Sequence, residues 1–361
     1  MRGFIGLFCV CTVLAAAPLA AQSLVDENAS AVVDTATVAT SKKKKQDKKV
    51  EAPPAHTQVF AGIETGNVEA VKPNLEWSTY YRHNEAGETA MTLAIQRQDV
   101  EMVRLLVEDA VINLKNKAGE TPLTLAIKSG HHEIIQLVAQ RAKAGLKNDA
   151  GEAPLFLAID MDDLDFMQYL IDHGADVNRK SQGRTPLSKA VAGNKLRTVA
   201  FLIKNGATAN TPNDNGEIPL YIAVRQGYDE IAGILINQSP DPRSDANWHN
   251  KVGETLLNMA AEKGYLNIMR LLLEGGADLE TTDYMNNTAL NVAAANGQQE
   301  IVDLLIGAGA DLNHKNLVGN TPATMAMENG HNAVAQTLVS QGADTSVRNY
   351  KGVALLTQPN N

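Results

Sequence analysis

The stretch Gly119-Glu-Thr121-Pro-Leu-Thr-Leu-Ala126-Ile-Lys-Ser-Gly130-His131 is the clearest copy of a pattern that returns along most of the chain. Two further copies are Gly183-Arg-Thr185-Pro-Leu-Ser-Lys-Ala190 and Gly319-Asn-Thr321-Pro-Ala-Thr-Met-Ala326. With the threonine slot as origin, the copies lie at residues 57, 89, 121, 153, 185, 218, 255, 288 and 321, spaced by 32 to 37 residues. A repeat of this length is typical of a stacked array of small units.

Each copy predicts two helices. Pro122 presets the first turn of one helix after a threonine cap, and a glycine, or Asn194 in one copy, ends that helix in a left-handed conformation. A second helix follows with apolar residues at helical spacing, such as Ile301 and Leu305. It ends at a second recurring signature, which reads Gly174-Ala-Asp-Val-Asn178, Gly206-Ala-Thr, Gly276-Ala-Asp-Leu, Gly309-Ala-Asp-Leu-Asn313 and Gly342-Ala-Asp in five copies.

These residues resemble the ankyrin repeat, and the resemblance covers residues 57–356. It implies an all-α solenoid of about nine helix-turn-helix repeats, joined by projecting finger loops and followed by a truncated C-terminal stub. Neighbouring units must stack, because no unit buries both faces alone. The histidine that the family carries in its first helix is replaced here by Thr124, Phe156, Ser188, Tyr221, Asn258, Asn291 and Thr324, so its hydrogen bonds must be made otherwise.

Copy six carries four extra residues within the segment from Ser239 to His249, which predicts one long, irregular finger. Trp248 in this segment is expected to be exposed and to anchor a partner. Asn286 replaces the turn glycine of other copies, and asparagine tolerates the left-handed region better than most residues.

The amino-acid composition and net charge reduce the classes of function that this chain can have. Of the 361 residues 44% are hydrophobic but only 4% are aromatic, so burial must rest on aliphatic side chains and alanine. The 32 basic and 41 acidic residues give a net charge of −9, which disfavours a nucleic-acid partner. Both cysteines, Cys9 and Cys11, lie near the start, so neither a disulfide scaffold nor a cysteine enzyme is expected.

Residues 1–21 are predicted to be an export signal, with Arg2 as the basic start, an apolar run from Phe4 and a cut after Ala21. The alternative is an uncleaved anchor, because the apolar run is 18 residues long. The alanine-rich cleavage region favours a bacterial periplasm, with secretion or membrane anchoring as alternatives. Residues 22–56 are predicted to be a disordered, lysine-rich linker, and 357–361 a C-terminal tail.

The lysine tract of this linker consists of Lys42, Lys43, Lys44, Lys45, Lys48 and Lys49. It suits contact with an anionic envelope surface, a nuclear address, or a solvated spacer.

No catalytic or metal-binding pattern emerges. The His131-His132 pair lies where the repeat itself supplies a turn, and Asp160-Met-Asp-Asp-Leu-Asp165 lacks the alternating ligands and glycine of a calcium loop. The sequence therefore predicts a non-enzyme without metal or cofactor.

The candidate partner-binding residues follow from the register of the fingers. Directly before the threonine slot lie Glu120, Glu152, Glu217 and Glu254, together with Glu88, while Arg184 takes the same slot in copy five. These glutamates predict an acidic ridge, or merely a solvated edge. In the C-terminal copies the tips turn apolar at Tyr284, Met285, Leu317, Val318 and Tyr350, and at Val252. Such tips serve either partner binding or packing between adjacent fingers.

The resemblance thus implies a non-catalytic scaffold, expected to be monomeric, that binds another protein through its fingertips and concave groove. Two alternatives stay open: a cell-envelope tether held by the lysine tract or an uncleaved N-terminal helix, and a secreted effector acting in another cell.

Overall fold

The computed structural model describes residues 54–108 and 112–346, with the side chains of residues 77 and 78 left out. The expected export signal, the lysine tract, Tyr350 and the C-terminal stub lie outside the described residues.

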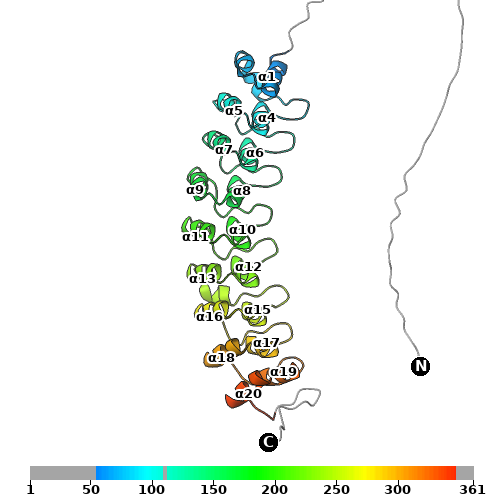
Figure 1. The fold of residues 1–361 in the computed structure, drawn as a ribbon, viewed down its shortest axis with the longest axis vertical. Helices are drawn as coiled ribbons and strands as arrows, with labels where there is room; N and C mark the ends of the chain where they lie inside the picture. The colour runs from blue at the N-terminus through cyan, green and yellow to red at the C-terminus, as the bar shows by residue number, and fades with distance from the viewer. Residues whose placement is uncertain (1–53, 109–111, 347–361) are drawn as a thin grey trace, which may run out of the picture. The chain divides into compact units, whose positions relative to one another are not determined.

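The described part of the chain is all-helical, as predicted, and its helices form two columns (Figure 1). The first helices of the repeats are α1 (Ala55–Thr65), α4 (Ala90–Gln96), α6 (Pro122–Ser129), α8 (Pro154–Met161), α10 (Pro186–Ala192), α12 (Pro219–Gln226), α15 (Leu256–Lys263), α17 (Ala289–Ala295) and α19 (Pro322–Glu328). The second helices are α2 (Val68–Val71), α5 (Val100–Leu106), α7 (His132–Ala139), α9 (Leu164–Asp172), α11 (Leu196–Lys204), α13 (Asp229–Asn237), α16 (Leu266–Glu274), α18 (Gln299–Gly307) and α20 (Asn332–Ser340).

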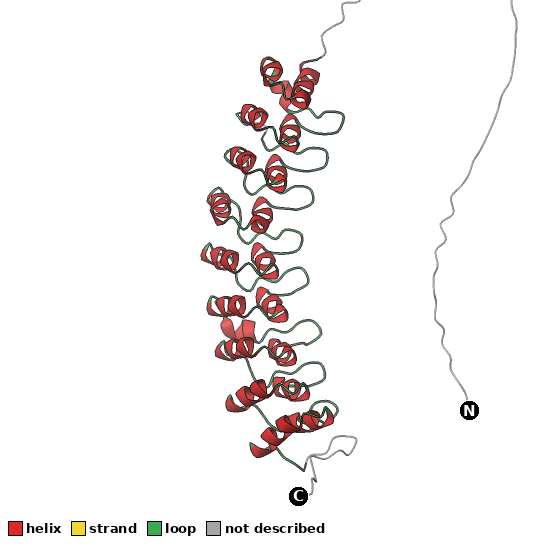
Figure 2. Ribbon diagram, viewed as in Figure 1, coloured by secondary structure: helices red, strands yellow, loops and turns green. Residues whose placement is uncertain are grey.

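Loops project from the side of the first column and form the fingers, and the described residues contain isolated β-bridges but no strand (Figure 2). Three short elements interrupt the regular alternation: the 3-10 helix η1 (Lys72–Asn74), α3 (Trp77–Tyr80) and α14 (Pro242–Ala246). None of the helices in the described ranges is long and apolar enough to cross a bilayer.

The first helices begin as the repeat pattern predicts. At α6, the Thr121 hydroxyl accepts a hydrogen bond from the backbone N–H of Thr124, while Thr124 Oγ1 accepts from the N–H of Thr121. This reciprocal cap satisfies N–H groups that the start of a helix leaves free. In this repeat, and in those with Asn291 and Thr324, the residue that replaces the family histidine closes the turn itself, whereas α8 and α12, with Phe156 and Tyr221, have no side-chain cap. Asn194 and Asn286 have the expected positive φ, 53° and 59°.

Small residues let the columns pack closely. The residue five positions after the threonine slot has no exposed surface in eight repeats, where it is Ala94, Ala126, Ala158, Ala190, Ala223, Ala260, Ala293 and Ala326. The first repeat has Gly62 there, and a Cβ at Gly62 would lie 2.5 Å from Cγ2 of Val71. The bulky Val71 of the short helix α2 therefore requires a glycine at this position.

The extra residues of copy six do not form a long finger. They fold into α14, whose N-cap Asp241 accepts a hydrogen bond from the N–H of Ser244 and whose Pro242 occupies the first turn. The helix packs against α13, and Asp245 is buried beside Ser239, where burial raises the pKa of its carboxyl group. The finger that follows has the same closing turn as its neighbours. The prediction of an irregular finger is wrong because this local sequence carries its own helix start.

Candidate interaction surface

The fingers form a connected row, because backbone hydrogen bonds join several neighbouring tips. The N–H of Lys117 donates to the carbonyl oxygen of Gly87 at 2.8 Å, and the N–H of Asp149 donates to that of Gly119 at 2.9 Å. Near the other end, the N–H of Leu317 donates to the carbonyl oxygen of Met285 at 2.9 Å. The main chain thus holds the tips in register whatever their side chains are.

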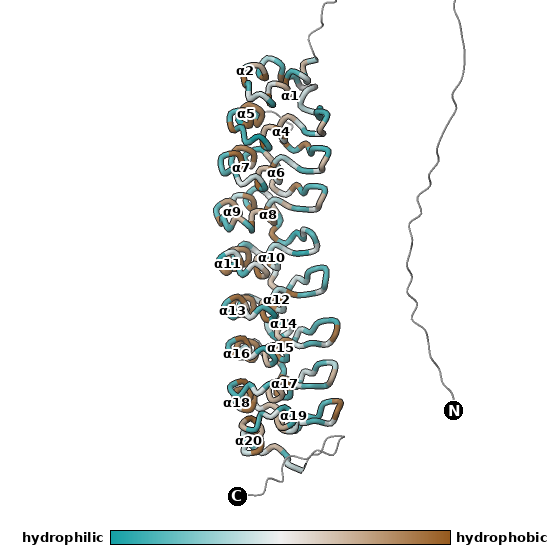
Figure 3. The backbone as a smooth tube through the Cα atoms, turned by 45° about the vertical axis from the view of Figure 1, so that its right-hand side comes forward, coloured by the Kyte–Doolittle hydropathy of each residue, from teal (hydrophilic) through white to brown (hydrophobic). Residues whose placement is uncertain are grey.

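The chemical character of the tips changes along this row. Toward the N-terminal end the tips carry the exposed charged residues Lys117, Asp149 and Asp214. Three consecutive fingers toward the C-terminal end carry Val252, Tyr284 and Leu317, which are 68%, 73% and 61% exposed. The loops are mostly hydrophilic, with hydrophobic tips toward the C-terminal end (Figure 3). We call Val252, Tyr284 and Leu317 the apolar tips.

The predicted residues beside them are less accessible. Met285 and Val318 are half-buried, so part of the apolar surface serves packing within the finger row, while Tyr284 and Leu317 point into solvent. Burial therefore separates adjacent positions: Met285 and Val318 are partly covered, whereas Tyr284 and Leu317 stay exposed.

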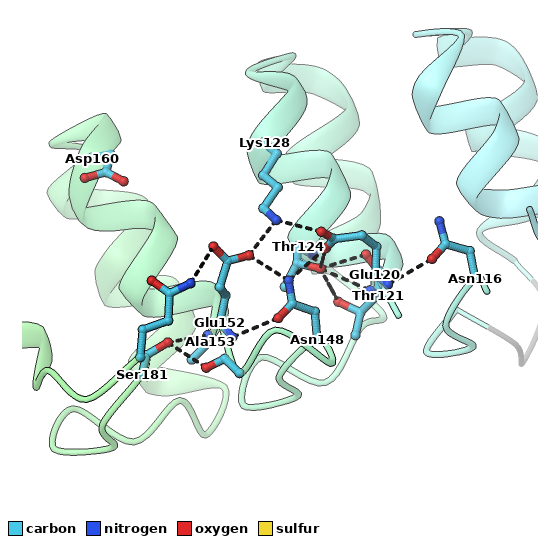
Figure 4. A network of polar contacts seen from close by, with 12 residues as sticks. Asn116, Glu120, Thr121, Thr124, Lys128, Asn148, Glu152, Ala153, Asp160 and Ser181 are labelled. Atoms are coloured by element: carbon cyan, nitrogen blue, oxygen red, sulfur yellow. Dashed lines mark hydrogen bonds and ion pairs between the residues drawn. The ribbon is translucent and has the colours of Figure 1, made fainter. Parts of the chain in front are cut away.

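The glutamates do not form an open ridge. Glu120 and Glu152 lie at the bases of their fingers with only 20% and 16% of their side chains exposed, and Lys128 of α6 lies between them (Figure 4). Lys128 Nζ is 2.6 Å from Glu120 Oε1 and 2.5 Å from Glu152 Oε2. Asn148 Nδ2 donates to Oε2 of both carboxylates, at 2.9 and 2.7 Å. The expectation of an acidic ridge along the fingers is corrected to a line of half-buried, hydrogen-bonded carboxylates, of which Glu120, Glu152 and Glu217 form ion pairs.

The pKa values of these groups reflect this network. Burial raises the pKa of Glu120, but hydrogen bonds from Lys128, Asn148 and Thr124 outweigh it and lower the pKa below its usual value. For Glu152 the hydrogen bond from Lys128 is the largest effect and lowers the pKa. Lys128 shows the reverse balance: burial lowers its pKa, and the hydrogen bonds to the two glutamates raise it overall. All three groups are therefore held in their charged forms.

The remaining members of the line are paired as well. Glu217 Oε1 lies 2.8 Å from Arg225 Nη1, and Glu217 Oε2 accepts a hydrogen bond from Asn213. Burial raises the pKa of Glu217, but these partners lower it below its usual value. Glu254 accepts a hydrogen bond from Asn250 at 2.8 Å. At the same slot Arg184 places its guanidinium 5.5 Å from the ring centroid of Phe156.

Trp248 is half-buried and not the open anchor that the sequence predicts. Its ring lies 4.7 Å from that of Tyr221 in α12 and packs against the core. The expectation of good exposure is wrong because the turn after α14, which is capped by Asn247, places Trp248 against Tyr221.

The sequence reasoning missed an asparagine five residues before the threonine slot. Asn148 Oδ1 accepts a hydrogen bond from the N–H of Glu152 at 2.8 Å, and this bond closes the finger. The same bond recurs at Asn84, Asn116, Asn213, Asn250 and Asn316, with Asp283 taking the position once. The recurrence of asparagine at this slot was the signal that could have revealed it.

Comparison with known proteins agrees with this geometry. The family model of ankyrin repeats, which describes three copies, matches the chain in overlapping segments that together span residues 59–349. The chain therefore belongs to the ankyrin-repeat family. Ankyrin repeats generally mediate binding between proteins and are typically non-catalytic. A comparison with curated proteins finds no significant match.

Proposed function

We propose that this chain is a non-catalytic scaffold that binds a partner protein through the apolar tips. The observation that carries the proposal is their exposure: among the described residues, the exposed large hydrophobic side chains are Tyr81, Val252, Tyr284 and Leu317. Three of these four lie on consecutive fingers. Neighbouring exposed apolar side chains are typical of protein interaction sites, whereas single ones are ordinary.

The half-buried glutamates and the apolar tips have different roles in this proposal: the glutamates stabilise the fingers, and the tips bind the partner. Its carboxylates are already paired within the chain, so contact with a partner would have to compete with Lys128 and Arg225. Val252 and Leu317 have apolar side chains that form no such pairs, and their backbone N–H groups donate to Asn250 Oδ1 and to the carbonyl oxygen of Met285. We therefore place the principal contact at the tips and treat the glutamates as part of the scaffold.

The test is affinity capture with a matched pair of triple variants. One variant carries Val252→Ser, Tyr284→Ser and Leu317→Ser, and the control carries Lys117→Ser, Asp149→Ser and Asp214→Ser at exposed tips of earlier fingers. The proposal predicts that a partner held by the parent chain and the control is lost from the first variant, with at least about a tenfold weaker Kd. Equal capture by both variants would contradict this site while leaving the scaffold role open.

We also propose export, supported by the composition of residues 1–21. Expression in a bacterium followed by mass determination of the periplasmic protein tests it, and the expected mature chain begins at Gln22. Recovery of the full-length chain in the membrane pellet would favour the tether instead. Deletion of residues 41–49 then decides whether the lysine tract holds it there, since loss of that contact should release the protein to the supernatant.

A further inference from the structure

A cluster of potential metal ligands lies between the loops that lead to two of the apolar tips. Glu280 precedes the finger that carries Tyr284, and Asp311 and His314 precede the finger that carries Leu317. Each of the three residues offers one ligand atom, and these atoms lie within 4.8 Å of one another. The cluster thus joins two neighbouring repeats through side chains that are far apart in sequence.

The other atoms of these side chains are held by the backbone. Glu280 Oε1 accepts a hydrogen bond from the N–H of Asp311 at 2.9 Å, and Asp311 Oδ1 accepts one from the N–H of Asn313 at 2.9 Å. His314 Nε2 lies 3.0 Å from the carbonyl oxygen of Asn286. Outer hydrogen bonds of this kind orient the ligands of metal sites.

The histidine contact indicates the tautomer. A carbonyl oxygen only accepts, so a hydrogen bond at this 3.0 Å contact requires the tautomer of His314 with its proton on Nε2, which has a lone pair on Nδ1. Asn286 Nδ2 also lies 3.2 Å from His314 Nε2, a longer contact than the one to the carbonyl oxygen of Asn286, and it donates to the carbonyl oxygen of Lys315 at 2.8 Å. His314 Nδ1 faces Glu280 Oε2 at 3.9 Å, too far for a hydrogen bond. Two ligand atoms of one tetrahedral Zn²⁺ lie about 3.4 Å apart, so a small rotation of either side chain brings Nδ1 and Oε2 to a shared ion.

Comparison among the repeats shows that the carboxylate of Glu280 is not needed for the fold. In four other repeats the corresponding residue is an asparagine. The side-chain oxygens of Asn113, Asn178, Asn247 and Asn313 accept the equivalent hydrogen bond from the N–H groups of Lys143, Thr208, Asp278 and Asp344, each at 2.8 Å. Glu280 makes the same bond with one oxygen and presents a second, charged oxygen to His314. A neutral amide would have satisfied the backbone equally well.

We infer that Glu280, Asp311 and His314 bind a divalent transition-metal ion of the zinc class, with water completing its coordination. Imidazole and carboxylate ligands suit such ions, and three protein ligands with an open position are a common arrangement. This site departs from the sequence-based expectation of no metal, because its ligands come from two repeats. The bound ion ties together the loops that lead to Tyr284 and Leu317, and so stiffens part of the proposed binding surface.

Titration of the full chain with Zn²⁺ by calorimetry tests the site, with Cys9 and Cys11 changed to Ser in every protein because thiols also bind zinc. Glu280→Gln retains the acceptor for Asp311 but removes the charge, and His314→Gln removes the imidazole. Each variant is expected to weaken one Zn²⁺ site by at least about tenfold. The control His83→Gln alters a histidine whose Nε2 also lies 3.0 Å from a carbonyl oxygen, that of Lys115, and should change the affinity less than about twofold.

Thermal melting without metal checks that the variants fold, and the absorption of bound Co²⁺ gives a second readout that His314→Gln should abolish. The inference is overturned if the parent protein binds no Zn²⁺ at 1:1 stoichiometry, if both site variants bind as tightly as the parent, or if His83→Gln weakens binding equally. None of these results depends on the partner, so the site can fail while the proposed scaffold role stands.

Discussion

The backbone N–H of Leu317 donates to the carbonyl oxygen of Met285, and this bond leaves the side chain of Leu317 free in solvent. Lys117 and Asp149 make the corresponding bonds at other fingers with charged side chains. At this tip position the fold therefore requires only the backbone hydrogen bond and no particular side chain. An apolar side chain there gains little for the fold, and this is why we propose the apolar tips as the binding surface.

Changing the apolar tips should leave the stability of the fold nearly intact. We expect Val252→Ser, Tyr284→Ser and Leu317→Ser together to alter the free energy of unfolding by less than about 1 kcal/mol, because exposed substitutions cost little. Urea denaturation followed by circular dichroism measures this. A larger loss would mean that these side chains pack in the folded protein, and any weaker capture by the variant could then not be assigned to lost contacts.

Lys128→Met should destabilise the protein by about 1 kcal/mol at pH 7, because it leaves Glu120 and Glu152 without their shared cation. The lowered pKa values of both carboxyls mean that this stabilisation is present above the unfolded-state pKa and is lost as the pH falls through the folded values. The difference in the free energy of unfolding between the parent and Lys128→Met should therefore decrease below about pH 4.

Urea denaturation at pH 7 and at pH 3 measures the difference in the free energy of unfolding between the parent and Lys128→Met at each pH. Lys117→Met is the matched control, since Lys117 is exposed at a fingertip. It should have no comparable effect at either pH. A loss for Lys128→Met that is the same at both pH values would show that its aliphatic packing, and not its charge, supports the fold.

In one repeat the two side chains that close the finger are exchanged, so that the carboxylate and the amide take each other's positions. Asp283 takes the asparagine slot and Asn287 the glutamate slot, and Asn287 Nδ2 donates to Asp283 Oδ2 at 3.0 Å. Asn250→Asp should cost about 1–2 kcal/mol, because a carboxylate would replace the amide that donates to Glu254. Adding Glu254→Asn should recover at least half of this loss by recreating the natural pair. Strictly additive effects in the double-mutant cycle would refute the coupling.

The parts of the fold that the sequence predicted are those that depend on neighbouring residues in the chain. The threonine cap at Thr121 and the left-handed turns at Asn194 and Asn286 follow from local chemistry, and the structure confirms them. Asp241-Pro242 is an equally local helix start, but the extra residues around it break the repeat and so predict a loop where the structure has α14.

The candidate site was less predictable because its properties depend on contacts between repeats. Glu152 is neutralised by Lys128, which is 24 positions earlier in the chain, and Trp248 packs on Tyr221, which is 27 positions earlier. Register along the fingers placed Tyr284 and Leu317 correctly at exposed tips, yet it could not distinguish them from the half-buried Met285 and Val318. The pairing of Glu280 with His314 likewise needs the stacking of two repeats.

Substitution of Trp248 tests whether this residue packs within the fold or binds a partner. Because its ring contacts Tyr221 at 4.7 Å, we expect Trp248→Leu and Tyr221→Leu to show a coupling of about 0.5–1.5 kcal/mol in a double-mutant cycle. Trp248→Leu should lower the midpoint of urea denaturation without weakening partner capture under native conditions. The neighbouring His249→Ala, at an exposed position, is the control and should leave the midpoint unchanged. Weaker capture by Trp248→Leu with unaltered stability would instead make Trp248 a binding anchor and would extend the apolar surface toward α14.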